Sequence, residues 1–399
     1  MKIYKNENFK KVRVNNEDTI LPNDWFIKKY KDFGGFKTGK DYKNFIGDKY
    51  SVYGSSEKAM PIKTNFPLYS NISFIIGRKG TINKPYRIDK PFWCVDTAMY
   101  FNLSSGNRDF LFYTCSMVDW MKYNKGGVLP SLTQSFINEF EFISPNVEEQ
   151  KRIADVLSKQ ESIINKTKDL IEQLDKRNTF MLDELLSGRL RIKEENGKME
   201  FYKNPDDNWK DVLINRNKVK IPKDYNNIKI EGNYSDLGKS KIKAKSCNLE
   251  GKYPFFNCSV NQTLRSDNYI HDLESLYLST GGKPAVHYYN GKASYSTDVW
   301  SISFNKDEIL NKFIYLFFYN NMSLLEQSFK GAGLKHLSKK DFQNIEIILP
   351  SKIDQENIIE IYKKINNEKE KYEELLIEEQ KKFDFLLEEL MSGRLRIEE

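Results

Sequence analysis

The hexapeptide Ser-Gly-Arg-Leu-Arg-Ile occurs twice in this chain, at Ser187–Ile192 and at Ser392–Ile397. The second copy follows the first by 205 residues in a chain of 399, and each copy ends a long charged stretch. Six identical residues repeated at half the chain length are not expected by chance, so we interpret the chain as a tandem duplication. A duplicated chain presents two equivalent surfaces, and its function should be one that uses both of them.

Longer segments of the two halves also align, but with lower identity. Residues 9–25 align without a gap on residues 209–225, and residues 126–145 align on residues 331–350. A duplication whose globular parts were free to diverge would leave this pattern. We therefore expect each half to bind its own target, while the matching helix ends keep a common partner.

The composition indicates a folded chain with much solvated surface. Hydrophobic residues make up 39% of the chain, charged residues 30% and aromatic residues 14%. The aromatic side chains supply apolar area for a core, which argues against disorder. The formal net charge of +7 permits a polyanionic partner, although a lysine- and asparagine-rich composition explains it equally well.

The sequence carries no motif for a metal site, a membrane span or secretion. The four cysteines share no CxxC spacing, and none stands near the three histidines in the order of a zinc site. No apolar run approaches about 18 residues, and the N-terminal residues lack the apolar core of a signal peptide. We therefore expect a cytoplasmic protein with reduced thiols, no metal and no membrane contact.

Catalytic motifs are also missing. The sequence contains no Walker A loop and no GxGxxG, HExxH or GxSxG motif. Ser279–Pro284 lacks the frame of a phosphate loop, and Asn204–Asp207 is not the tetrapeptide with which amino-methyltransferases hold adenine. We expect that the chain catalyses nothing by itself. The alternative is a nuclease or methyltransferase whose catalytic site is too degenerate to recognise.

Each half is predicted to contain one mixed α+β domain followed by a long helix. Alternating, aromatic-rich segments such as residues 73–78 and 293–304 predict strands, and residues 109–123 and 309–329 predict amphipathic helices. The fold class is therefore α+β with two tandem-repeat domains. The chain divides into 1–145 (first domain), 146–195 (first long helix), 196–350 (linker and second domain) and 351–399 (second long helix).

The long helices begin after Pro145 and Pro350, where a near-heptad apolar series predicts about 40 residues, or about 60 Å, of helix. Asn146 is the expected N-cap, and Gly188 and Gly393 are the expected C-cap glycines. Gaps in one apolar series are filled in the other, so we expect an intramolecular antiparallel coiled coil. The alternative is that each helix packs on its own domain. A rod of this length would suit a ligand with two separated sites.

Glycine-bounded loops with basic and hydroxyl side chains recur in both halves. One set comprises Gly77–Thr81 and Thr280–Lys283, and the other comprises Gly126–Thr133 and Gly331–Ser338. Glycine lets the backbone approach a ligand closely, and Arg, Lys, Ser and Thr contact phosphates and base edges. Any one loop could be an ordinary hairpin, but the recurrence of both sets favours DNA binding. The candidate DNA-binding residues are Arg78, Lys79, Thr81, Lys84, Arg87, Ser131, Thr133, Thr280, Lys283, Lys335 and His336.

Two diverged α+β domains that alternate with long helices ending in the same hexapeptide resemble the specificity (S) subunit of type I restriction-modification systems. The resemblance covers essentially the whole chain. It also rests on Ile143–Leu157, on the segments IIGRKGTINKPY and DTAMYF, and on a fainter copy of the helix entry at Leu349–Tyr362. The second entry has Asp-Gln-Glu where the first has Glu-Glu-Gln, which we interpret as drift.

The resemblance implies that each globular part is a target recognition domain for one half of a bipartite double-stranded DNA site. The helices would set the spacing and dock two methyltransferase (M) subunits, which bring S-adenosylmethionine and methylate adenine. Two restriction (R) subunits, where they are encoded, would add translocation and cleavage driven by ATP and Mg²⁺. This chain would bind no cofactor itself. A specificity subunit of a solitary adenine methyltransferase, and a coiled-coil scaffold without a nucleic-acid role, are the alternatives.

Apolar and basic residues that recur near the helix ends are the candidates for docking the partner subunits. They could equally pack within the chain. These residues are Leu185, Leu186, Arg189, Leu390, Met391 and Arg394.

Overall fold

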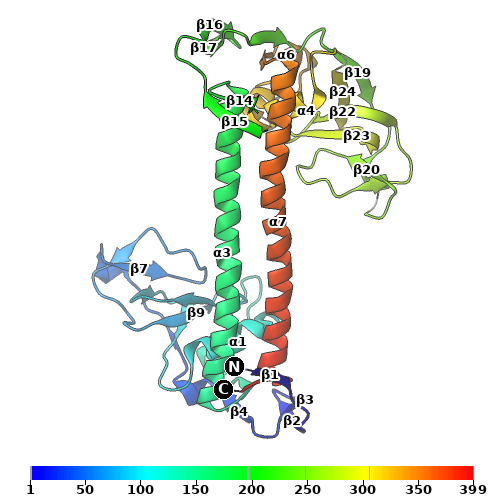
Figure 1. The fold of residues 1–399 in the computed structure, drawn as a ribbon. Coiled ribbons are helices and arrows are strands. Elements are labelled where there is room, and N and C mark those ends of the chain that lie inside the picture. The colour runs from blue at the N-terminus through cyan, green and yellow to red at the C-terminus, as the bar shows by residue number, and fades with distance from the viewer. Residues whose placement is uncertain (1, 196–197, 248, 305, 399) are drawn as a thin grey trace. The chain divides into compact units, whose positions relative to one another are not determined.

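Two helices of 40 residues, α3 (Val147–Leu186) and α7 (Lys352–Met391), are the longest elements of the computed structural model (Figure 1). The structure describes residues 2–195, 198–247, 249–304 and 306–398. The chain divides into two units, one made of Met1–Asp169 and Glu374–Glu399 and the other of Leu170–Glu373. Each unit contains one half of each long helix. The four-part division expected from the sequence stays a prediction.

The ends of the long helices carry the caps that the sequence predicts. The side chain of Asn146 accepts a hydrogen bond from the backbone N–H of Glu149 at 2.9 Å. Gly188 and Gly393 follow the last helical turns with φ of +73° and +71°, a left-handed conformation that glycine adopts without strain. The predicted N-cap and both C-cap glycines are confirmed.

The halves of α3 and α7 that share a unit run antiparallel to each other. In the first unit, the side-chain amide of Gln160 donates to the backbone carbonyl of Glu379 at 3.3 Å. In the second unit, Asn178 donates to the carbonyl of Ile365 at 3.0 Å. These polar residues occupy gaps in the apolar series of α3, and their hydrogen bonds satisfy them against the facing helix. The predicted antiparallel pairing is thereby confirmed within each unit. Both helices also pack on the domain of their own unit, which was the alternative.

The hexapeptides leave the helices and form strands. After Gly188 the chain enters β14 (Leu190–Glu195), which pairs with β15 (Lys198–Lys203), and after Gly393 it enters β28 (Leu395–Glu398), which pairs with β1 (Lys2–Lys5). The two ends of the chain therefore lie together in the first unit (Figure 1). The helices stop at Leu186 and Met391, before the ends of the segments 146–195 and 351–399 in which the sequence analysis placed them.

The first unit is built around a four-stranded sheet that carries the aromatic core. Phe36, Phe74 and Phe101 from this sheet are fully or almost fully buried and contact one another edge to face or stacked. The sheet has the order β10 (Tyr86–Ile88), β9 (Ser73–Gly77), β12 (Ala98–Phe101), β5 (Phe36–Thr38). A smaller sheet has the order β11 (Trp93–Cys94), β7 (Tyr50–Tyr53), β8 (Lys63–Thr64), β6 (Ile46–Gly47). The other elements are the hairpin β2 (Phe9–Val14)–β3 (Glu17–Pro22), the pair β4 (Phe26–Lys29)–β13 (Glu141–Ser144), and helices α1 (Arg108–Met117) and α2 (Gln134–Glu139).

The second unit carries a larger sheet of six strands. Leu276, Trp300 and Ile302 from its centre are fully buried against α4 (Asn311–Asn320). The sheet has the order β19 (Tyr234–Lys239), β24 (Val299–Phe304), β22 (His271–Ser279), β23 (Val286–Tyr295), β20 (Tyr253–Phe256), β21 (Arg265–Ser266). The other elements are the hairpin β16 (Trp209–Ile214)–β17 (Asn217–Pro222), the pairs β18 (Asn226–Lys229)–β27 (Glu346–Leu349) and β25 (Phe329–Lys330)–β26 (His336–Leu337), and helices α5 (Met322–Gln327) and α6 (Lys339–Gln343).

Each unit thus mixes helix and sheet as the sequence predicts, and the α+β fold class is confirmed. Across the part of the chain that the structure describes, no helix has both the length and the apolar character needed to cross a bilayer.

Candidate nucleic-acid interface

In the first unit, the two loop sets singled out in the sequence come together. An antiparallel bridge pairs Lys79 with Ser131. The backbone N–H of Gly80 donates to the carbonyl of Pro130 at 2.9 Å, and the N–H of Leu132 donates to the carbonyl of Arg78 at 2.9 Å. These backbone hydrogen bonds hold the two loops side by side. We call this contact the first loop junction.

The second unit repeats the same junction with different side chains. Here an antiparallel bridge pairs Gly281 with His336, which occupies the position equivalent to Ser131. The N–H of Leu337 donates to the carbonyl of Thr280 at 3.1 Å, and the N–H of Gly282 donates to the carbonyl of Lys335 at 3.2 Å. Nδ1 of His336 lies 3.2 Å from the carbonyl oxygen of Thr280. We call this contact the second loop junction.

Most of the predicted DNA-binding side chains at the junctions are open to solvent. The exposed residues are Lys79, Thr81, Lys84, Thr133, Lys283, Lys335 and His336. Ser131 and Arg78 are half-buried, and Nε of Arg78 donates to the carbonyl of Asp96 at 2.7 Å. The hydroxyl of Thr280 is turned inward and donates to the carbonyl of Asp298 at 2.9 Å, while the hydroxyl of Thr133 caps α2. The structure therefore places nine of the eleven residues in or directly next to a loop junction, all except Lys84 and Arg87, and leaves two hydroxyls in structural roles.

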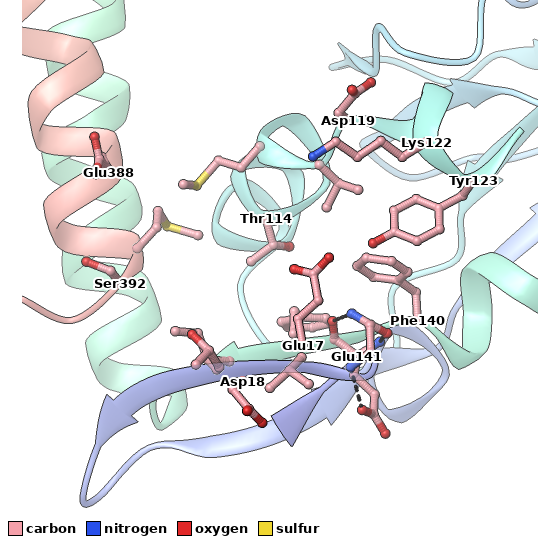
Figure 2. Close-up of a pocket in the computed structure, with 18 residues that line it drawn as sticks. Glu17, Asp18, Thr114, Asp119, Lys122, Tyr123, Phe140, Glu141, Glu388 and Ser392 are labelled. Atoms are coloured by element: carbon pink, nitrogen blue, oxygen red, sulfur yellow. Dashed lines mark hydrogen bonds between the residues drawn. The ribbon is translucent and has the colours of Figure 1, made fainter. Parts of the chain in front are cut away.

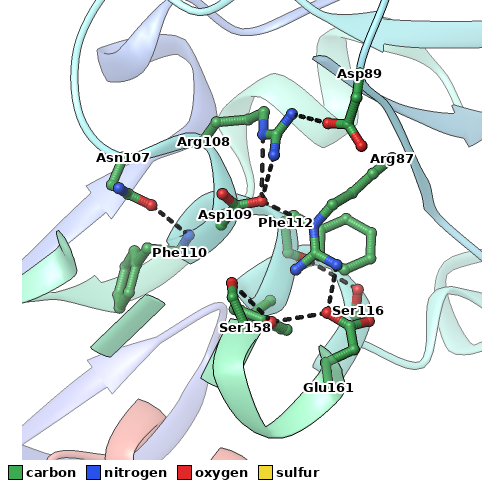
Figure 3. A network of polar contacts seen from close by, with 11 residues as sticks. Arg87, Asp89, Asn107, Arg108, Asp109, Phe110, Phe112, Ser116, Ser158 and Glu161 are labelled. Atoms are coloured by element: carbon green, nitrogen blue, oxygen red, sulfur yellow. Dashed lines mark hydrogen bonds and ion pairs between the residues drawn. The ribbon is translucent and has the colours of Figure 1, made fainter. Parts of the chain in front are cut away.

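The guanidinium of Arg87 is instead held between two carboxylates (Figure 3). Its Nε lies 2.8 Å from Asp109, and its Nη1 donates to Glu161 on α3 at 2.6 Å. The guanidinium also stacks 3.9 Å from the ring centre of Phe112, and the hydroxyl of Tyr113 donates to Glu161 at 3.0 Å. The charge of Arg87 is thus balanced inside the first unit, and a phosphate contact would have to break these ion pairs.

The second arginine of each hexapeptide, Arg191 or Arg396, forms equivalent ion pairs in both units. Arg396 donates to Asp24 at 2.8 and 3.0 Å and to Glu149 at the start of α3. Arg191, its equivalent, donates to Asp224 at 2.8 and 3.1 Å and to Asp354 near the start of α7. The hydrogen bond from each arginine holds the pKa of Asp24 and of Asp224 below its usual value of 3.8. Each arginine fixes a hexapeptide to the start of the facing helix.

The six predicted docking residues pack within their own unit. Leu185, Leu186, Leu390 and Met391 are each less than 5% exposed. Arg189 forms ion pairs with Asp183 and Glu184, and Arg394 forms them with Glu388 and Glu389. Of the two roles left open by the sequence, the structure shows packing within the chain. A role in docking stays a prediction.

Two exposed features repeat in both units and were missed in the sequence. Phe180 on α3 and Phe385 on α7 occupy equivalent positions, and their side chains are 66% and 57% exposed. A groove of about 420 Å³ in the first unit (Figure 2) has a counterpart of about 200 Å³ in the second. The signal that could have found the aromatic pair is their identity at the 205-residue spacing of the hexapeptides, on the polar side of each helix.

The described part of the chain offers no obvious metal or thiol chemistry. Among those residues, no three or more His, Cys, Asp or Glu side chains are grouped as metal ligands would be. All four cysteines are free thiols, and burial raises the pKa of Cys94 and of Cys115. The pKa of His287 is lowered by burial, so this histidine is neutral near pH 7.

Comparison with known families gives two matches within this one chain. The family described as "Type I restriction modification DNA specificity domain" matches residues 19–176 and again residues 232–379. Together these segments make up more than half of the chain, and one falls largely in each unit.

Specificity subunits are also found among the curated relatives of this chain. The chain is 23% identical over 447 aligned residues to the putative type I restriction enzyme MjaX specificity subunit of Methanocaldococcus jannaschii, covering 100% of this chain and 99% of that protein. It is 27% identical over 145 residues to the type I restriction enzyme EcoDI specificity subunit of Escherichia coli, covering 35% of this chain and 31% of that one.

Solved structures share the fold. The S subunit of a type I restriction-modification system from M. genitalium matches with a TM-score of 0.64 and 16% identity, over 92% of this chain and 96% of that one. A chain from a structure of type I R-M complex assembly and conformational transition matches with a TM-score of 0.51 and 12% identity, over 94% and 99%. At these identities the likeness establishes the arrangement of elements alone.

Proposed function

The chain belongs to the type I restriction modification DNA specificity family, and on that premise we propose that each of its two recognition domains reads one half of a bipartite DNA site. The observation that carries this proposal is the loop junction, which has the same backbone pairing in both units. Ser131 in the first junction is replaced by His336 in the second, and the bridge partner changes from Lys79 to Gly281. Two loop junctions with the same backbone pairing but different side chains suit two DNA half-sites of different sequence.

The side chains at the junctions have the chemistry that duplex DNA requires. Lys79 and Lys84 in the first unit, and Lys283 and Lys335 in the second, are exposed cations that can contact phosphates. Hydroxyl and imidazole groups at Ser131 and His336 can form hydrogen bonds to base edges in a groove. Phosphate contacts supply affinity and position the domain. The sequence preference would therefore come from the hydroxyl of Ser131 and the imidazole of His336.

We assign the spacing between the half-sites to α3 and α7. Each helix is 40 residues long and contributes one half to each unit, so the two recognition domains are joined through both helices. An α-helix rises about 1.5 Å per residue and resists bending, which makes its length a fixed quantity. Two half-sites read in successive grooves must lie about one helical turn, roughly 34 Å, or more apart.

The catalytic steps are assigned to partner subunits. Two methyltransferase subunits would bring S-adenosylmethionine and methylate one adenine in each half-site, and restriction subunits, where encoded, would use ATP and Mg²⁺. This chain would bind none of these cofactors. In support, the side chains displayed on the recognition loops are cationic, hydroxyl and imidazole groups, which suit contacts to DNA.

The test is a map of methylated adenines in cells that carry the methyltransferase subunit with and without this chain. We expect a gapped, bipartite motif with one methylated adenine on each strand, which disappears when the chain is removed. A continuous motif, or a motif that persists without the chain, would overturn the proposal. The purified chain given DNA with Mg²⁺ or S-adenosylmethionine should neither cut nor methylate it.

A further inference from the structure

A groove in the first unit lies between the β2–β3 hairpin and the C-terminal end of α7. Figure 2 shows Glu17 and Asp18 on the hairpin, Glu388 on α7, and Ser392 directly after the end of α7. Apolar side chains including Val14, Val118 and Met391 also line the groove, whose volume is about 420 Å³. Its wall is held by Asn15, whose side chain donates to the carbonyl of Glu141 at 2.8 Å.

The second unit has the same groove at the equivalent place. It lies between the β16–β17 hairpin and the C-terminal end of α3, and its volume is about 200 Å³. Asp183, Leu186 and Ser187 occupy the positions of Glu388, Met391 and Ser392. The wall is again held by an asparagine, because the side chain of Asn215 donates to the carbonyl of Glu346 at 2.8 Å. Two grooves built by the same contacts are available for two identical occupants.

An exposed phenylalanine stands beside each groove. Phe385 precedes Glu388 by three residues, and Phe180 precedes Asp183 by three, so each ring shares a helix face with a groove residue. In the second unit, Phe180 and Asp183 also line one further hollow together. Single exposed apolar residues are ordinary on a protein surface, but these two rings recur at equivalent positions without serving the core of either unit.

Two other exposed isoleucines on the same helices do not recur in this way. Ile163 is 43% exposed, and the residue at the equivalent position of α7 is Glu368. Ile377 is 56% exposed, and the equivalent residue of α3 is Glu172. The phenylalanines therefore differ from a background of scattered apolar side chains, and the isoleucines supply matched controls.

The charge of both grooves favours a basic protein segment over DNA. The first groove is lined by one lysine, Lys122, and by the carboxylates of Glu17, Asp18, Asp119, Glu141 and Glu388. The second is lined by Asp183 and Glu346 and by no Lys or Arg. Arg394 and Arg189 balance part of this charge through ion pairs to Glu388 and Asp183. A net negative groove in a chain of charge +7 repels phosphates and attracts lysine and arginine.

We propose that Phe385 with the first groove, and Phe180 with the second, form two copies of one docking surface for a basic, partly apolar segment of the methyltransferase subunit. The inference rests on the proposed function, since it names the surface on which each of the two partner copies binds. The ring anchors an apolar patch of the partner, the apolar floor takes an apolar side chain, and the acidic rim takes Lys or Arg. Each unit binds one partner copy independently.

The test measures how many methyltransferase subunits the full-length chain binds, by native mass spectrometry of co-expressed, purified complexes. The wild-type chain is expected to bind two copies, Phe180→Lys or Phe385→Lys one, and the double variant none. Each single change should weaken its site by about tenfold or more, as expected for a buried aromatic anchor. Phe180→Leu and Phe385→Leu should keep two copies. So should the controls Ile163→Lys and Ile377→Lys, which add the same charge outside the surface.

The outcomes separate this inference from the proposed function. Two copies bound to the double Phe→Lys variant would overturn the docking surface, and bipartite methylation by the wild-type complex would then leave the proposed function intact. Loss of binding in the isoleucine controls as well would also overturn it, because the effect would be one of charge on the helices. A wild-type chain that binds no methyltransferase subunit would overturn both. Circular dichroism of each variant should match that of the wild type, since the substituted rings are exposed.

Discussion

Gly188 offers a direct test of why the hexapeptide has the same sequence twice. Its φ is +73°, and a Cβ placed there would lie 2.4 Å from Cγ of Pro222 and 3.0 Å from Tyr225. Gly232, in the same unit, has a similar φ of +75° but no atom within 4 Å of such a Cβ. Substituting alanine at Gly188 therefore adds conformational strain and a clash, while the same change at Gly232 adds only the strain.

The magnitudes follow from these two terms. A left-handed conformation costs a non-glycine residue about 1–2 kcal/mol, and the stiffer unfolded chain returns about 0.4–1 kcal/mol of that. Gly232→Ala should thus lower the free energy of unfolding by about 1 kcal/mol or less. Overpacking against a proline ring adds about 1–3 kcal/mol, so Gly188→Ala should cost about 2–4 kcal/mol. Gly393→Ala should cost as much in the first unit, because its Cβ would lie 2.4 Å from Cγ of Pro22.

Hydrogen exchange followed by mass spectrometry on the full-length chain assigns the loss to a unit. Gly188→Ala should lower protection at the end of α3 and in the β16–β17 hairpin, while peptides from the first unit keep theirs. Gly393→Ala should show the reverse. If Gly188→Ala and Gly232→Ala were equally mild, close packing at the hexapeptide would not explain its repetition, and the reasoning would be refuted.

Three other perturbations test separate parts of the structure. Arg87 and Glu161 form a half-buried ion pair, so a double-mutant cycle with Arg87→Met and Glu161→Gln should give a coupling of about 1 kcal/mol in denaturant unfolding. Zero coupling would contradict the network. Arg396 holds the pKa of Asp24 below 3.8, so Asp24 adds stability that is complete above that pH and is lost as pH falls through the lower folded pKa. Asp24→Asn should make the free energy of unfolding depend less on pH below the usual Asp pKa of 3.8, and an unchanged pH dependence would count against this ion pair. The third perturbation deletes seven residues within Leu170–Met181 together with the facing turns of α7. It should shorten the gap in the methylated motif by about three base pairs and leave both half-sites unchanged. Altered half-sites would reject the spacer role.

Local signals in the sequence predicted the parts of the fold that depend on neighbouring residues. Asn146, Gly188 and Gly393 are caps whose chemistry is set by the adjacent helix, and all three are confirmed. The antiparallel pairing was predicted because polar residues such as Gln160 and Asn178 interrupt the apolar series of one helix where the other series is apolar. Both side chains donate hydrogen bonds to the facing helix. The strands after the glycines were not predicted, because Leu-Arg-Ile was included in the segments 146–195 and 351–399 that were assigned to the long helices.

Interactions between distant residues could not be obtained in the same way. Arg87 was assigned to DNA because it follows a recurring basic loop. Its partners Asp109 and Glu161 are 22 and 74 residues away along the chain, so the sequence could not show these ion pairs. The docking candidates were chosen by recurrence, which core residues such as Leu185 share with surface residues such as Phe180. Recurrence in both halves indicates that two residues share a role, but it does not show whether they are buried in the core or exposed on the surface.

The central claim is that each loop junction reads its own half of one DNA site. The most direct measurement maps methylated adenines in cells that carry the methyltransferase subunit with the wild-type chain, with Lys79→Ala/Ser131→Ala, or with Lys335→Ala/His336→Ala. The account predicts that the first double variant relaxes or changes bases in one half-site only, and that the second does so in the other half-site only. Changes in both halves from either variant, or unchanged halves from both, would contradict it.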